Sequence, residues 1–131
     1  MITLSDGTTT LQLHPDLMWS DEFNWQPVEQ AAEFSVTGAL IVQEAAKQAG
    51  RPITLEPEDD NSAWMLRDTI EQLRNWAAEA GKTLELTLRG VPRSVIFRRT
   101  DGPGVEARPV AHYSEMEAAD FYLATFRFME I

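Results

Sequence analysis

Apolar and polar residues alternate in several short runs of this chain, which is the pattern of strands that bury one face. The clearest run is 83–89, in which Leu84, Leu86 and Leu88 are separated by polar residues. Each of the other runs is bounded by turn-forming residues, mostly glycine or proline. They predict further strands at 52–56, 94–99, 105–113 and 121–131.

The N-terminal run predicts a hairpin over residues 2–13. Asp6 and Gly7 lie at its centre, between β-branched and apolar residues. This pair readily adopts the positive φ angles of a tight two-residue turn.

The run 39–49 fits two structures. Residues 44–49 are good helix formers, so intrinsic propensity alone favours a helix. The apolar run 40–42 is typical of a strand, and Gly50 with Pro52 ends it sharply. We expect a strand followed by a turn at 47–51, preceded by a weakly patterned segment at 28–36.

One segment has the period of a helix, residues 63–80. Its apolar positions are three or four residues apart and form one stripe. Gly81 is expected to end this helix in the left-handed conformation. The stripe consists of Leu66, Ile70, Leu73, Ala77 and Ala80.

Four acidic residues precede the predicted helix. Asn61 or Ser62 could cap its first N–H groups, and Asp59 and Asp60 would lie near the positive end of its dipole. The acids lack the alternating carboxylates and central glycine of a calcium loop. We therefore interpret the run 56–60 as a helix-start signal that binds no metal.

These elements predict an α+β fold in one domain, residues 1–131. We expect a mostly antiparallel β-sandwich or split barrel with the helix at about 63–80 packed on it. The final run, 121–131, is apolar on both faces. As the last strand it is expected to have a free edge, and a neighbouring subunit is the candidate to cover it.

The charge balance bears on partners. The chain has 21 acidic and 11 basic residues, a net charge of −10. Because nucleic-acid affinity depends on neutralising phosphates, specific nucleic-acid binding is not expected. Two readings remain: a solvated acidic surface, or acidity directed against DNA or a basic partner.

The composition also bears on the compartment. The chain has no cysteine, which excludes disulfides and thiolate chemistry and fits a reducing compartment. No run approaches the roughly 20 apolar residues of a membrane helix, and the start lacks the order of a signal peptide. A soluble intracellular product without membrane association is expected.

No catalytic, metal-binding or cofactor-binding residues are predicted. His14 and His112 are far apart, and neither has further ligands at the spacing of a zinc site. No serine lies in a nucleophile elbow, and no pair of carboxylates is singled out. We expect a protein that is not an enzyme.

Aromatic residues are the candidates for contact with another chain. Trp19, Phe23 and Trp25 lie in an irregular segment, where they could cap the open end of a core or form an interface. The final strand adds the second group of candidates, Tyr122, Phe126 and Phe128.

Several fragments resemble a family of small tail-tip or baseplate structural proteins of tailed bacteriophages. They are "GALIVQEAAKQAGRPITLE", the following helix with Trp64, "SVIFRRTDGPGVEARPV" and "FYLATFRFMEI". The most specific pieces are residues 50–55, Phe97-Arg98 and 101–103. The resemblance covers roughly residues 20–131. The run 39–49 departs from it by being more helix-prone than the corresponding hairpin.

The resemblance implies a virion component of the phage tail, made in the bacterial cytoplasm, with a tail-tube-like fold. Such a protein would assemble with itself and with other tail proteins into a ring around the DNA channel. The alternative is an acidic phage-encoded inhibitor or DNA mimic that binds a basic host protein. Its carboxylates would then be spaced like phosphates.

We expect calorimetric titration with Ca²⁺, Mg²⁺ and Zn²⁺ to show no specific site, because the acids at 56–60 lack ligand spacing. A stoichiometric calcium isotherm that disappears in the double variant Asp59→Asn, Asp60→Asn would contradict this interpretation.

Overall fold

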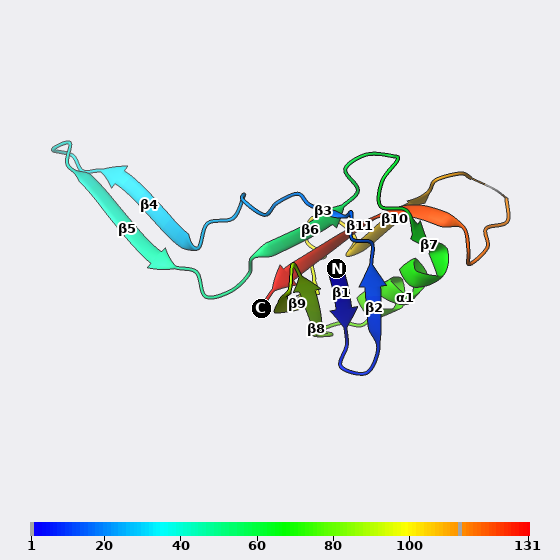
Figure 1. The fold of residues 1–131 in the computed structure, drawn as a ribbon. Helices are drawn as coiled ribbons and strands as arrows, with labels where there is room; N and C mark the ends of the chain where they lie inside the picture. The colour runs from blue at the N-terminus through cyan, green and yellow to red at the C-terminus, as the bar shows by residue number, and fades with distance from the viewer. Residues whose placement is uncertain (1, 113) are drawn as a thin grey trace.

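A long two-stranded hairpin projects from a body made of one large antiparallel sheet and one helix (Figure 1). The computed structural model describes residues 2–112 and 114–131. Its elements are β1 Ile2–Ser5, β2 Thr10–Leu13, β3 Met18–Trp19, β4 Val28–Phe34, β5 Leu40–Ala46, β6 Pro52–Glu56, β7 Met65–Leu66, α1 Arg67–Ala77, β8 Leu84–Leu88, β9 Val91–Phe97, β10 Val105–Pro109 and β11 Phe121–Glu130.

The last strand, β11, organises the body. The main path of the nine-stranded sheet runs β2-β1-β8-β9-β11-β6-β3, and β10 and β7 also pair with β11. One edge of β11 pairs with β10 and then β9, and the other with β7 and then β6. The expectation of a free edge on the last strand is therefore wrong.

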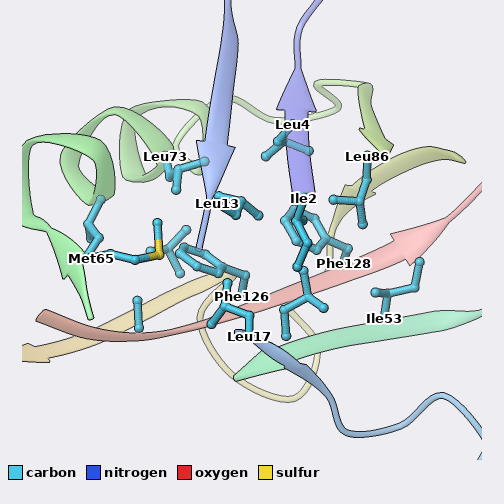
Figure 2. Packing of buried hydrophobic residues seen from close by; sticks show 14 of the residues in the cluster. Ile2, Leu4, Leu13, Leu17, Ile53, Met65, Leu73, Leu86, Phe126 and Phe128 are labelled. Atoms are coloured by element: carbon cyan, nitrogen blue, oxygen red, sulfur yellow. The ribbon is translucent and has the colours of Figure 1, made fainter. Parts of the chain in front are cut away.

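The core lies inside the bend of this sheet. Figure 2 shows β1 and β2 crossing the face of β11 and β6, with Ile2, Leu4 and Leu13 above Phe126 and Phe128. Both phenylalanine side chains are 0% exposed. The antiparallel sheet with its single helix confirms the α+β class. Across the described residues the sheet does not close into a barrel.

The helix is shorter than the predicted 63–80 segment at both ends. It ends at Ala77 with Ala78 as its C-cap in the right-handed conformation, so the expectation that Gly81 ends it is wrong, and its first residues are used differently. Ala63 has a positive φ of 58°, and Met65 and Leu66 pair with β11. The stripe nevertheless points inward at its centre, where Ile70 and Leu73 are 3% and 0% exposed. Leu66 and Ala80, at the two ends of the predicted stripe, are exposed.

The start of α1 is not capped as predicted. Its N-cap residue is Leu66, which makes no side-chain capping bond. The backbone N–H groups of Arg67 and Asp68 instead donate to the carbonyls of Asp120 and Ala118, at 2.9 and 3.2 Å. The capping roles expected of Asn61 and Ser62 are therefore wrong.

The acidic run belongs to the loop before β7. The Asn61 N–H donates to Asp59 Oδ1 at 2.9 Å, and the Trp64 indole donates to the Asp60 carbonyl at 2.9 Å. The Asp60 carboxylate also pairs with Arg108 of β10. These contacts hold the loop beside the sheet, which replaces the helix-dipole role expected of Asp59 and Asp60.

The ambiguous run 39–49 forms a strand, as predicted. Leu40–Ala46 pairs along its whole length with Val28–Phe34. The chain reverses at residues 35–39, where Gly38 adopts a φ of +87°. Backbone pairing with β4 thus overrides the helix propensity of residues 44–46.

Turns account for the remaining differences from the sequence. The hairpin at 2–13 forms, but its loop has four residues, since Ser5 pairs with Thr10. The hairpin formed by β8 and β9 turns at Arg89 and Gly90, with φ of 53° and 79°. Strand β9 therefore begins at Val91 instead of residue 94. The strand expected at 105–113 ends at Pro109, and Tyr113 lies outside the described residues.

We expect Leu73→Ala to lower the free energy of unfolding by about 2–5 kcal/mol, because it leaves a cavity between α1 and the sheet. Gln72→Ala, at an exposed position of the same helix, should change it by less than about 0.5 kcal/mol. Urea denaturation measures both. Equal midpoints for the two variants would show that the helix does not pack as described.

Candidate interaction surfaces

The hairpin β4–β5, which we call the arm, has one apolar face. Opposite residues of an antiparallel pair point to the same side, and the register sets Phe34 against Leu40 and Ala32 against Val42. Phe34 is 74% exposed and Leu40 is 59% exposed. The same face also holds the hydrogen-bonded pair Gln30 and Glu44. Its apolar members, which we call the apolar face, are Val28, Ala32, Phe34, Leu40, Val42 and Ala46.

The acidic residues of the arm differ in their partners. Glu44 accepts a hydrogen bond from Gln30, and Glu29 lies 3.6 Å from the Lys47 ammonium. Glu33, next to Phe34 near the tip, makes no hydrogen bond or ion pair within the described part of the chain. The tip therefore carries an exposed aromatic ring on one face and an unpaired carboxylate on the opposite face.

The arm shares no hydrogen-bonded strand with the body, because β4 and β5 form a separate two-stranded sheet. A two-stranded hairpin alone has marginal stability in water. A group of exposed apolar side chains on one face is also typical of a surface that another molecule covers. The arm is therefore the strongest candidate interaction surface of the chain.

A hollow of about 580 Å³ lies at the root of the arm. We call it the Trp19 hollow, after the side chain at its centre. Apolar walls come from Leu88 and Val91 at the β8–β9 turn. Its aromatic and charged lining includes Trp19, Phe23, Trp25, Arg51, Arg89 and Arg93.

Three guanidinium groups surround the indole of Trp19. Its ring centroid lies 4.7 Å from the guanidinium carbon of Arg51, 5.3 Å from that of Arg93 and 5.8 Å from that of Arg89. Arg51 is also 5.6 Å from the ring of Trp25. Cations are attracted to the faces of aromatic rings, so the hollow concentrates positive charge in a chain whose net charge is −10.

Part of this positive charge is neutralised within the chain. Arg89 pairs with Glu22, and Arg93 Nη1 lies 3.0 Å from Glu130 Oε2. Arg51 Nη2 donates to the backbone carbonyl of Glu22 at 2.9 Å. Within the described residues, Arg51 has no carboxylate at ion-pair distance.

Three side chains that line the hollow have a buried N–H donor without an acceptor. The donors are Trp19 Nε1, Arg51 Nε and Arg93 Nε, each enclosed by the chain itself. A buried donor that loses its bond to water and gains no other acceptor destabilises the structure. These three atoms are therefore a cost to the folded chain and are not open to the hollow.

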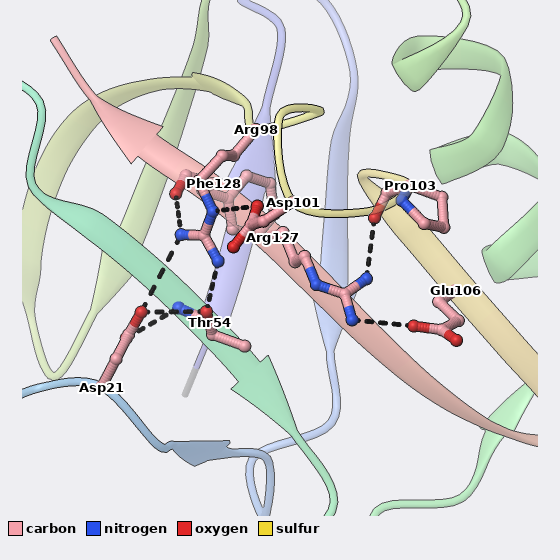
Figure 3. A network of polar contacts seen from close by, with 8 residues as sticks. All are labelled: Asp21, Thr54, Arg98, Asp101, Pro103, Glu106, Arg127 and Phe128. Atoms are coloured by element: carbon pink, nitrogen blue, oxygen red, sulfur yellow. Dashed lines mark hydrogen bonds and ion pairs between the residues drawn. The ribbon is translucent and has the colours of Figure 1, made fainter.

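The buried side chain of Arg98, beside β11, contacts Asp21 in the segment that lines the hollow (Figure 3). Arg98 is 8% exposed. It donates to Asp101 Oδ1 at 2.8 Å, to Thr54 Oγ1 at 2.7 Å and to the Phe128 carbonyl at 3.1 Å. Asp21 lies 3.8 Å away and accepts from the Thr54 N–H and hydroxyl, both at 2.9 Å.

The two carboxyl groups whose pKa values are lowered have structural partners. The hydrogen bond from Arg98 lowers the pKa of Asp101 below its ordinary value, and the charge of Arg98 acts in the same direction. The pKa of Asp6 is lowered by the N–H groups of Thr9 and Thr8 in the first hairpin loop. Both carboxylates are held in the charged form, which suits ion pairing and turn formation.

The structure brings together one group of predicted interface residues and buries the other. Trp19, Phe23 and Trp25 all line the Trp19 hollow, and Phe23 is 90% exposed. Tyr122, Phe126 and Phe128 are 9%, 0% and 0% exposed. These three side chains pack in the chain's own core, so the interface role assigned to them is corrected.

Sequence reasoning missed the apolar face of the arm. The signal was present, because residues 28, 32 and 34 and residues 40, 42 and 46 are apolar at even spacing. It was obscured by the helix propensity of the second strand.

In residues 2–112 and 114–131, no three His, Asp or Glu side chains gather closely enough to hold a metal ion. The one helix in that part of the chain is too short to cross a membrane. Comparison with protein-family models, with curated proteins and with solved structures gave no match. The resemblance to phage tail proteins therefore depends on the sequence fragments alone.

Asp101 contributes stability that is lost in acid. Because its folded pKa is lowered from 3.8, its contribution is present above that value and disappears as the pH falls through the folded pKa. We expect Asp101→Asn to destabilise the protein at pH 7 and to flatten the fall of the urea midpoint below about pH 4. Glu58→Gln, which removes an exposed carboxylate, should leave that profile unchanged.

Proposed function

We propose that this protein is a non-enzymatic structural component of a tailed-phage tail tip or baseplate. It assembles with itself and with other tail proteins into a ring around the DNA channel. The observation that carries the proposal is the apolar face of the arm, which the described chain leaves uncovered. A surface of this kind serves assembly better than it serves an isolated protein.

The negative charge supports the same role. A ring whose subunits each carry a net charge of −10 would repel phosphates along its lumen. DNA could then pass without adhering, because binding requires phosphate neutralisation by basic groups. Two basic side chains of the Trp19 hollow, Arg89 and Arg93, are paired with Glu22 and Glu130. This pairing supports a role for them within the subunit and not in binding DNA.

The net charge of −10 also favours a second candidate function, an acidic inhibitor or DNA mimic that binds a basic host protein. Such a protein would bind its target through clustered carboxylates. It would have no use for the apolar face of the arm, which is why we place it second.

The first test is whether the protein is a constituent of virions. We expect peptide mass spectrometry of purified phage particles to detect it in stoichiometric amount. Infectious particles of normal yield that lack the protein would contradict the proposed function.

A second test uses the double variant Phe34→Asp, Leu40→Asp. We expect it to block incorporation into particles, because two charges on the apolar face oppose its burial, while the helix signal in circular dichroism is retained. The control is Thr8→Asp, at an exposed position of the first hairpin loop, which should be incorporated normally. A DNA mimic would instead keep target inhibition in the arm variant and lose it when acidic clusters are neutralised.

A further inference from the structure

The tip of the arm and the Trp19 hollow have complementary chemistry. The tip offers an exposed phenylalanine, Phe34, on one face of β4 and the unpaired carboxylate of Glu33 on the opposite face. The hollow offers aromatic walls and Arg51, whose guanidinium has no carboxylate at ion-pair distance within the described residues. We propose that the Trp19 hollow of one copy receives the arm tip of a second copy end-on, with Phe34 on one face of the tip against the indoles and the Glu33 carboxylate on the other face accepting from Arg51.

This inference deepens the proposed function, since it rests on the chain assembling with itself. It names the two surfaces that meet and the contact that selects them.

The charge of Arg51 suits the hollow to a carboxylate. Its Nη2 donates to a backbone carbonyl, that of Glu22, at 2.9 Å. Hydrogen bonds from a guanidinium to a carboxylate are among the strongest that proteins form. Arg51 is the best placed of the cations, because within the described residues no carboxylate lies at ion-pair distance from it.

The overall charges of the two surfaces agree with this pairing. The arm, Val28–Ala46, contains Glu29, Glu33 and Glu44 and no lysine or arginine. The hollow sets three arginines against the carboxylates of Glu22 and Glu130. Opposite charge on two surfaces steers their encounter and fixes their register.

The apolar contacts also agree. The hollow has a volume of about 580 Å³, within the usual range for sites that enclose a small organic group. Its walls include Leu88 and Val91, and Val91 is 49% exposed. An aromatic anchor in such a hollow is typical of the residues that dominate binding energy.

The occupant must come from another molecule. The arm extends away from the body (Figure 1), and the hollow lies at its root, with Trp25 and Pro27 in the lining. The tip of an arm therefore lies far from the hollow of the same chain. A contact between two different surfaces of identical chains is head-to-tail, which is the arrangement that builds rings.

The absence of cysteine from the chain allows a direct test by disulfide cross-linking. One preparation carries Val36→Cys at the tip, where Val36 is 106% exposed, and the other carries Val91→Cys in the hollow. The two are mixed and mildly oxidised, and cross-linked peptides are quantified by mass spectrometry. Because each cysteine is on a different molecule, a link between positions 36 and 91 reports an intermolecular contact.

The matched control mixes Val36→Cys with Thr8→Cys, an exposed position in the β1–β2 loop. We expect the 36–91 link to exceed the 36–8 link by at least about tenfold, since a disulfide needs closely placed Cβ atoms. Equal yields of the two links, including no link in either mixture, would overturn the inference.

A charge test separates the Glu33 contact from general electrostatics. Glu33→Lys should weaken self-association by at least about tenfold in analytical ultracentrifugation. Glu29→Lys makes the same change in charge near the root of the arm and should have little effect. Equal weakening by both variants would contradict the role of Glu33.

The two proposals can fail separately. If the protein is found in virions but the 36–91 link does not exceed its control, the docking assignment is wrong and the proposed function stands. If the 36–91 link forms but virions lack the protein, the docking stands and the tail function is wrong.

Discussion

The hydrogen bonds and ion pairs of the Arg98 guanidinium are the interactions on which the Trp19 hollow and the root of the arm depend. A charged group that is 8% exposed must have partners, and those of Arg98 come from four separate segments. Thr54 lies on β6, Phe128 on β11 and Asp101 in the turn before β10, while Asp21 lies between Trp19 and Phe23, two residues that line the Trp19 hollow. One side chain therefore joins the middle of the sheet to the segment that leads into the arm.

The local elements could largely be predicted from the sequence. Leu84, Leu86 and Leu88 alternate and are buried, so the period of β8 alone defines its inner face. The start of α1 could not be predicted, because pairing of Met65 and Leu66 with β11 decides it, and the two partners are more than 50 residues apart. The Trp19 hollow could be predicted only in its aromatic half, since its arginines come from distant parts of the chain.

The apolar pattern of the last strand illustrates a general limit. A run with apolar residues on both faces is expected either for a strand in the middle of a sheet or for one at a subunit contact. The sequence of β11 does not distinguish these cases. Its partners on both edges place it in the middle, and the core side chains packed on its face leave Phe126 and Phe128 0% exposed. The exposed apolar strands belong to the arm, whose polar residues make it the less conspicuous candidate.

The separate hydrogen bonding of the arm has a consequence for how the free chain unfolds. Because β4 and β5 share no ladder with the nine-stranded sheet, the arm can open while the body stays folded. Its backbone amides would then exchange with solvent through local opening, at a free energy well below that of the whole chain. Substitutions in the arm would leave the cooperative melting of the body unchanged. The arm, which exposes several large apolar side chains, thus adds little to the stability of the body, which frees its sequence to be shaped by what it binds.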